Sequence, residues 1–193
     1  SHGHGQGYAD PHFIIPELVE EVRVHEGPYR AEDGDFATAG AVDLRYMTRV
    51  RESSLTLQGG MYGNARLLGI ARTEAGRVRG YLAAELAHDN GPFVNPLRYQ
   101  RFNVVGRWSY DLSGGARLTL TAMSYGGAWN ASGQVPTRLT DDPRSGFSRF
   151  GAVDPTEGGQ SERHSASLAL RVPLASGGLL DVMAWVSRYQ LSI

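Results

Sequence analysis

Residues 99–126 read YQRFNVVGRWSYDLSGGARLTLTAMSYG, and the alternation of side chains in this stretch decides the fold class. In its first half, one parity carries Phe102, Val104, Gly106, Trp108 and Tyr110, and the other carries Arg101, Asn103, Val105, Arg107 and Ser109. After the turn at 111–114, one face carries Ala116, Leu118, Leu120 and Ala122, and the other carries Arg117, Thr119 and Thr121. Period-two alternation predicts strands with one apolar and one polar face. Two strands of about ten residues joined by a tight turn have the length that crosses a bilayer as a tilted hairpin.

The composition of the chain excludes several classes of protein. It has 193 residues, of which 41% are hydrophobic, and no apolar run approaches the length of a membrane-spanning helix. With a net charge of −1 and no dense basic run, we expect no nucleic-acid partner. The absence of cysteine excludes thiol catalysis, cysteine-ligated zinc and a disulfide framework. The 25 glycines lie within strand-like segments as well as in turns, as large curved sheets require.

The same alternation continues along most of the chain and predicts a mainly β fold. Long strands are expected at 53–61, 64–72, 78–88, 99–110, 115–126, 163–173 and 179–190, after a short helix at 14–20 and two short strands at 21–25 and 39–45. The connections at 73–76, 111–114 and 175–178 are short, whereas those at 88–97 and 127–162 are long. Short turns at one end and long loops at the other are typical of an outer-membrane β-barrel.

Residues 17–45 resemble the end of the plug domain of TonB-dependent outer-membrane receptors. The family pattern is a Val/Ile-Glu-x-Val strand, a Gly-Pro, a variable loop with a glycine, and Gly-Gly-x-Ile/Val-Asn-Ile/Leu. The matching residues are Val19-Glu20-Glu21-Val22, Gly27-Pro28, Gly34 and Ala39-Gly40-Ala41-Val42-Asp43-Leu44, with Ala39 and Asp43 as mild departures. Residues 154–170 resemble the end of an early extracellular loop of the same family, so that the resemblance covers essentially the whole chain.

The resemblance implies two parts and a transport function. Residues 1–48 would be the C-terminal part of an α+β plug, and residues 49–193 the first seven or so strands of an antiparallel transmembrane barrel of about 22 strands. Such receptors take up a scarce ligand, such as a ferric siderophore, across the outer membrane of a Gram-negative bacterium. The implied partners are outer-membrane lipid, the energy-transducing protein TonB and a small ligand such as a metal chelate. No cofactor is implied, and we expect no enzymatic activity.

The chain begins with Ser and has no signal-peptide pattern, no TonB box and no terminal aromatic strand. We therefore expect it to be a segment of a longer protein, with the TonB-binding part missing.

The resemblance also places candidate ligand-binding residues in two groups. The loop after the Gly-Pro would rise to the plug apex and offer Tyr29, Arg30, Glu32 and Asp33. The long outer loop would offer Arg138, Asp141, Asp142, Arg144, Phe147 and Phe150, with solvated flexibility as the default state of such a loop.

Other polar and aromatic residues have structural explanations that outweigh functional ones. The charges on the polar parity, Arg79, Glu85, Arg101, Arg107 and Arg117, are expected to hold the plug through hydrogen bonds and ion pairs. Trp108 and Tyr110 fit an aromatic girdle at the membrane interface. The set His2, His4 and His12, and the acids around Gly34, lack a specific ligand spacing, so no metal site is predicted.

Three other classes of protein remain as alternatives. An unplugged porin-like barrel would share the strands, but residues 17–45 argue against it. A soluble β-rich binding module, such as a carbohydrate-binding sandwich, would share the alternation but has no reason to segregate its loops by length. A hydrolase on a β scaffold is the third, and the chain contains no G-x-S-x-G, H-E-x-x-H or P-loop motif.

Overall fold

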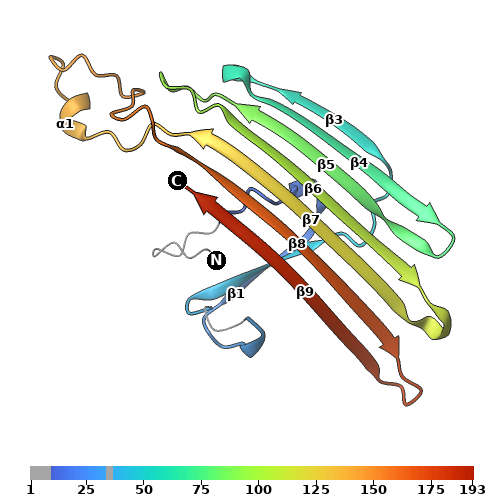
Figure 1. Cartoon of the computed structure of the whole chain (residues 1–193). Coiled ribbons are helices and arrows are strands. Elements are labelled where there is room, and N and C mark those ends of the chain that lie inside the picture. Colours follow the sequence, from blue (N-terminus) through green and yellow to red (C-terminus); the bar gives the residue numbers. More distant parts are fainter. Residues whose placement is uncertain (1–9, 34–36) are drawn as a thin grey trace.

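The computed structural model describes residues 10–33 and 37–193, and the described chain is mainly β with antiparallel sheets. The larger sheet has seven strands, each paired with the next one along the chain (Figure 1). They are β3 (Ser54–Gly59), β4 (Ala65–Ala75), β5 (Val78–Asp89), β6 (Tyr99–Asp111), β7 (Arg117–Asn130), β8 (Gly158–Pro173) and β9 (Leu179–Ser192). All seven predicted long strands are thus confirmed. Among the described residues, no helix is long and apolar enough to cross a membrane.

The two ends of this sheet carry different kinds of connection. We call one the turn end, where short turns join β4 to β5, β6 to β7 and β8 to β9. The other is the loop end, where the loops at 90–98 and 131–157 lie together with the short helices η3 (Met61–Gly63) and α1 (Thr137–Thr140). Figure 1 shows the turn end at the lower right and α1 at the upper left. The predicted segregation of short and long connections is therefore present.

The long loop is shorter than the predicted range 127–162, because β7 and β8 continue pairing as far as Asn130 and Gly158. Two glycines at the start of this continuation leave room for neighbouring aromatic side chains. A Cβ on Gly126 would lie 2.4 Å from the ring of Phe102, and one on Gly127 would lie 2.6 Å from the hydroxyl of Tyr125. The β7 strand continues through residues 127–130, which the sequence pattern assigned to loop.

The sheet has two faces that follow the predicted parity. On the outer face, Leu120 and Leu168 are 44% and 47% exposed and lie opposite each other on β7 and β8. On the inner face, Tyr81, Ala83 and Val105 are fully or almost fully buried. The predicted strand at 64–72 has leucines at two successive positions, and β4 directs Leu67 outward and buries Leu68 on the inner face.

The N-terminal segment, described at residues 10–33 and 37–50, packs against the inner face through its residues near 15–18 and 46–50. It contains η1 (Pro16–Leu18), β1 (Val19–Glu26), η2 (Ala31–Asp33) and β2 (Gly40–Tyr46), and β1 and β2 pair as a separate two-stranded sheet. Ile15, Leu18 and Val50 of this segment form one hydrophobic core with Leu68, Tyr81, Ala83 and Val105 of the larger sheet. Only one 3-10 turn replaces the helix predicted at 14–20, because the alternating residues from Val19 onward enter β1.

Candidate functional site

A buried ionic cluster joins the N-terminal segment to the inner face. The side chain of Glu85 is fully buried, and its carboxylate accepts a hydrogen bond of 2.6 Å from Arg66 Nε. Arg101 Nε lies 2.9 Å from the other oxygen of Glu85. Arg66 also donates to both carboxylate oxygens of Glu17, at 2.6 and 2.8 Å, and these hydrogen bonds hold the pKa of the Glu17 carboxyl below its ordinary value. One guanidinium therefore binds a carboxylate from each part of the chain.

The five inner-face charges were expected to hold the N-terminal segment. In the structure they fall into groups with different partners. Glu85 and Arg101 belong to the ionic cluster but pair with each other within the sheet, and the contact with Glu17 of the N-terminal segment is made by Arg66. Arg79 and Arg117 instead both pair with Asp111 at the turn end, at 2.7 Å each, so their ion pairs lie within the sheet. The remaining member, Arg107, lines a hollow between the sheet and the N-terminal segment.

Arg66, which links the two parts, was missed in the sequence. Its charge on the polar parity of β4 was the available signal, but Leu67 and Leu68 obscured that parity. The partner carboxylate of Glu17 lies 49 positions away along the chain, and no local pattern relates the two residues.

Asp10 forms a second link between the N-terminal segment and the inner face. Its Oδ1 accepts hydrogen bonds from the backbone N–H of His12 at 2.9 Å and pairs with His12 Nδ1 at 2.6 Å. Its Oδ2 accepts from the hydroxyl of Ser161 on β8 at 3.2 Å, and Ser161 is in turn 3.0 Å from the hydroxyl of Tyr125. Burial raises the pKa of the Asp10 carboxyl, but these hydrogen bonds outweigh it and hold the pKa below its ordinary value of 3.8.

The lowered pKa predicts how this link responds to acid. A carboxyl group whose pKa is lower in the folded than in the unfolded protein stabilises the fold at pH values above its unfolded pKa. This stabilisation is lost as the pH falls through its folded pKa. We expect Asp10→Asn to lower the unfolding free energy by about 1–2 kcal/mol at neutral pH. In denaturant titrations, the difference between the two proteins should stay constant above about pH 4 and shrink below it. A difference that persists unchanged into strong acid would contradict this assignment.

A cavity of about 530 Å³ opens beside Asp10 on the inner face near the loop end. It is lined by Asp10 and His12 of the N-terminal segment and by Asp89, Leu97, Tyr99, Tyr125, Trp129, Asn130, Leu191 and Ile193. The ring of His12 lies 5.8 Å from that of Tyr99, at an angle of 57°. We call this space the inner cavity. Its volume is in the range of pockets that bind small molecules, roughly 300–1,000 Å³.

The loops above the inner cavity are joined to each other by hydrogen bonds. Val94 N–H donates to the carbonyl of Phe150 at 2.9 Å, and the rings of Phe93 and Phe150 meet edge to face at 6.4 Å. The amide of Asn95 donates to the carbonyls of Ala131 and Pro155, at 3.3 and 3.2 Å. The loop at 131–157 is thus attached to the loop at 90–98 along part of its length.

The predicted outer-loop candidates lie on this joined structure. Arg138 is in α1, Asp141 follows α1, and the carboxylate of Asp142 accepts from the N–H of Arg144 at 2.9 Å. Phe150 contacts the neighbouring loop, and Phe147 lies close to Gly151. The guanidinium of Arg149, which the sequence did not single out, lies 5.0 Å above the ring of Phe150.

The predicted apex candidates lie elsewhere, on the connection between β1 and β2. Asp33 pairs with His25 Nδ1 at 3.2 Å, and Arg30 Nη1 lies 3.2 Å from the other ring nitrogen. Tyr29 is 87% exposed, and Glu32 is also exposed. Figure 1 shows this hairpin well apart from α1, so the structure does not bring the two groups of candidates together.

Of the three histidines considered as metal ligands, only one lies in the described part of the chain. His2 and His4 lie outside the described residues, and His12 pairs with Asp10. Among the described residues, no group of three or more His, Asp or Glu side chains is placed to hold a metal ion. Asp35 also lies outside the described part.

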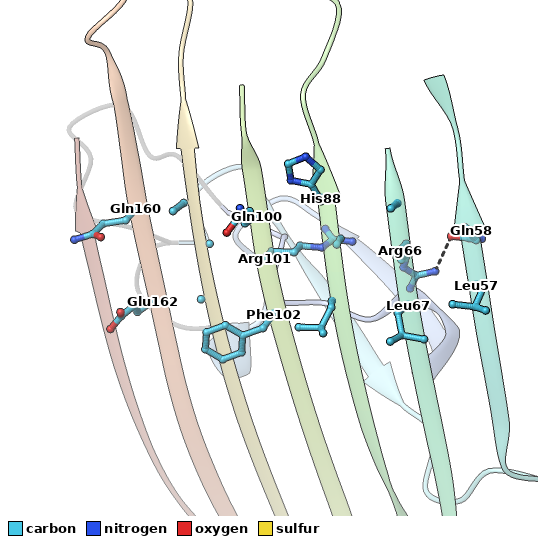
Figure 2. A pocket seen from close by; sticks show the side chains of 16 residues that line it. Leu57, Gln58, Arg66, Leu67, His88, Gln100, Arg101, Phe102, Gln160 and Glu162 are labelled. Carbon is cyan, nitrogen blue, oxygen red and sulfur yellow. Dashed lines mark hydrogen bonds between the residues drawn. The ribbon is translucent and has the colours of Figure 1, made fainter. Parts of the chain in front are cut away.

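The outer face carries a shallower hollow near the loop end, drawn in Figure 2. Gly126 is one of its lining residues and lies opposite Phe102 on β6 and Glu162 on β8. In Figure 2, Leu57, Leu67, Phe102 and Glu162 are drawn in the lower part of this hollow, and His88, Gln100 and Gln160 lie above them. This hollow lies on the opposite side of the sheet from the inner cavity.

Comparison of the chain with protein-family models, with curated proteins and with solved structures finds no match. The residues and their geometry are therefore the basis for a functional proposal.

Proposed function

We propose that the chain is the end of the plug and the first part of the wall of a TonB-dependent outer-membrane receptor, which takes up a scarce small ligand such as a metal chelate. The observation that carries this proposal is the division of one antiparallel sheet into two faces. The outer face is largely apolar and exposed, whereas the inner face carries charged and polar side chains around a hydrophobic cluster that packs against the N-terminal segment. A soluble sandwich would cover its apolar face with a second sheet.

The dimensions of the outer face fit a bilayer. On β6, apolar or aromatic residues run from Phe102 to Tyr110, which is roughly 27 Å of strand at about 3.3 Å per residue. A tilt of about 40° reduces this to roughly 20 Å, close to the apolar band of about 25 Å on outer-membrane barrels. Gln100 marks the polar border toward the loop end (Figure 2). Trp108 and Tyr110 lie toward the turn end, where an aromatic girdle would be expected.

The contacts of the N-terminal segment support its role as a plug. The ionic cluster at Arg66 and the hydrogen bonds of Asp10 bind this segment to the inner face, which would be the lumen of a closed barrel. Within the described residues, β3 and β9 are the edges of the sheet and are not paired with each other. We propose that further strands pair with these edges to complete the barrel, because open edges are not tolerated in lipid.

The inner cavity and the joined loops above it would then form the entrance for the ligand. The cavity lies where residues of the N-terminal segment meet the loop end of the sheet. A ligand bound there would contact both the wall and the plug, so that movement of the plug would release it. The energy for that movement would come from TonB.

This function can be tested with the protein expressed from its whole gene in cells with and without TonB. We expect it to fractionate with the outer membrane, to show heat-modifiable mobility in gels, and to support ligand accumulation only when TonB is present. A variant with an outer-face substitution that blocks assembly is the matched control for membrane insertion. A compact protein that is soluble without detergent, or uptake that is equal without TonB, would overturn the proposal.

A further inference from the structure

A second hollow on the inner face, of about 560 Å³, lies toward the turn end and is lined mainly by polar side chains and arginines. The N-terminal segment contributes its wall at Glu20, Arg45, Tyr46 and Thr48, and the rest of the lining comes from β6, β7, β8 and β9. Four arginines line it, Arg45, Arg107, Arg117 and Arg171, together with two acids, Glu20 and Asp181. We call this space the basic hollow. It shares no lining residue with the inner cavity.

Arg107 is the arginine of the basic hollow that no described carboxylate neutralises. Among the described residues it has no ion pair, and its buried Nε has no hydrogen-bond partner. Its neighbours in register, Tyr81 on β5 and Thr121 on β7, are not acids. Buried polar groups are normally hydrogen-bonded, because leaving one without a partner costs free energy. An anion bound in the hollow would supply the acceptor that Arg107 lacks.

On the sheet side of the hollow, arginines outnumber carboxylates. Arg117 and Arg79 share one carboxylate, that of Asp111, at 2.7 Å each, so their group keeps one positive charge. Arg171 and Asp181 form a bidentate pair, at 2.7 and 3.0 Å, and cancel each other. The part of the hollow nearest the turn end is therefore positive.

On the hairpin side, the charges balance. Glu21 pairs with Arg23 at 2.8 Å and with Arg45 at 3.4 Å, and Asp43 lies opposite Arg23 in the register of β1 and β2. Glu20 is exposed and adds one negative charge to the lining. Because Arg107 and the group at Asp111 each add one positive charge, the basic hollow keeps a positive excess.

Hydroxyl groups lie between the arginines as neutral donors. Those on the sheet side belong to Ser109, Thr119, Thr121 and Ser167. Guanidinium groups bind carboxylates through paired N–H donors, and hydroxyls can donate to the remaining oxygen lone pairs. The lining therefore has the donor chemistry of a carboxylate site.

The spacing of the arginines indicates how many carboxylates a ligand needs. Arg107 lies opposite Thr121 on β7, four residues from Arg117 on the same strand. At about 3.3 Å per residue, the two arginines lie roughly 13 Å apart along the strands. A single carboxylate cannot reach both guanidiniums, whereas a molecule with several carboxylates can approach both.

We propose that the basic hollow binds a small molecule with two or more carboxylate groups, one of them held by Arg107. The role of this site rests on the proposed uptake function. The turn end would then face the periplasm, because outer-membrane barrels have short periplasmic turns. The basic hollow would be a site on the exit side of the hydrophobic core, and the transported ligand would be an anion.

Three probes test the preference for several carboxylates. Propane-1,2,3-tricarboxylate is the polyanion, its triamide is the neutral isostere, and acetate is the single carboxylate. Titration calorimetry on the protein from the whole gene, in detergent, should give the tricarboxylate at least about tenfold higher affinity than acetate. The triamide should show no saturable binding, and added salt should weaken binding of the tricarboxylate. Equal affinity for the triamide, or no binding of the tricarboxylate, would overturn the inference.

Substitution of Arg107 assigns the binding to this hollow. Arg107→Gln should weaken tricarboxylate binding about tenfold, the loss of one hydrogen bond to a charged group. The change breaks no ion pair within the described chain. Arg188→Gln is the matched control, because Arg188 is exposed on the outer face of the same sheet and does not line the hollow. An equal loss in both variants would overturn the assignment.

Two further variants change the charge of the lining without removing an arginine. Glu20→Gln removes the negative charge and should tighten tricarboxylate binding about threefold. Thr119→Glu places a carboxylate inside the hollow and should weaken binding, which provides the test if Arg107→Gln fails to fold. Unchanged or weaker binding in Glu20→Gln, or unchanged binding in Thr119→Glu, would contradict the proposal.

The two proposals fail in different ways. A receptor that sits in the outer membrane and needs TonB, but binds the triamide as well as the tricarboxylate, would refute the anion site alone. A soluble protein that binds the tricarboxylate through Arg107 would refute the uptake function and leave the anion site in place.

Discussion

Replacing Glu85 with alanine should lower the free energy of unfolding by about 3–5 kcal/mol, the cost of removing one partner from a buried ion pair. The fully buried carboxylate of Glu85 binds both Arg66 and Arg101, and it also accepts from the amide of Asn103 at 3.0 Å. Its removal leaves two guanidiniums without this partner in a site with little access to water. Because Arg66 also binds Glu17, the substitution should loosen the N-terminal segment as well as the sheet.

Denaturant titration of the folded protein measures the stability loss, and limited proteolysis near residues 10–18 measures the loosening. Glu74→Ala is the control: Glu74 pairs with Arg72 on the same sheet but is 52% exposed, and exposed pairs contribute about 0–1 kcal/mol. Arg66→Ala should resemble Glu85→Ala in both measurements. Equal, small effects of Glu74→Ala and Glu85→Ala would show that the cluster does not hold the two parts together.

Leu120→Arg should impair assembly in the membrane by about 2–4 kcal/mol, as expected for a guanidinium on the lipid face near the bilayer midplane. Leu120 is 44% exposed on the outer face and lies between Trp108 of β6 and Leu168 of β8. No polar side chain of these two neighbours is available to pair with the new charge. The fraction of protein with heat-modifiable mobility after refolding into lipid reports the effect.

Substitution of the adjacent residue provides the matched control. Thr119 lies on the inner face, where its hydroxyl is 3.0 Å from that of Ser109. Thr119→Arg loses this hydrogen bond, at about 1 kcal/mol, and enters a hollow also lined by Arg107 and Arg117. Thr119→Glu places a carboxylate beside those arginines and should be tolerated better still. Equal impairment at positions 119 and 120 would refute the assignment of the two faces.

The strands were the most predictable part of this protein. Alternation is a local property, since successive side chains of a strand point to opposite faces whatever the strand pairs with. For that reason the predicted segments at 78–88 and 99–110 match β5 and β6 within one residue. The helix predicted at 14–20 and the long loop at 127–162 were less accurate. In both places the pairing of neighbouring strands, and not local pattern, decides where an element ends.

The candidate site was less predictable than the strands. The loop candidates on the β1–β2 connection and at 138–150 came from resemblance and not from residue chemistry, and the structure keeps the two groups apart. Their contact with a ligand remains a prediction. Trp129 was not singled out, because it fell inside the stretch assigned to loop.

The sequence by itself determined the two-faced strands, their order and the contrast between short turns and long loops, because these depend on residues close together in the chain. Only the tertiary structure decided which polar residues meet. Arg66 binds Glu17 from 49 positions away, and Ser161 binds Asp10 from 151 positions away. Such contacts depend on how the N-terminal segment lies against the inner face. The buried ionic cluster and the acidic, aromatic cavity exist only once that packing is complete.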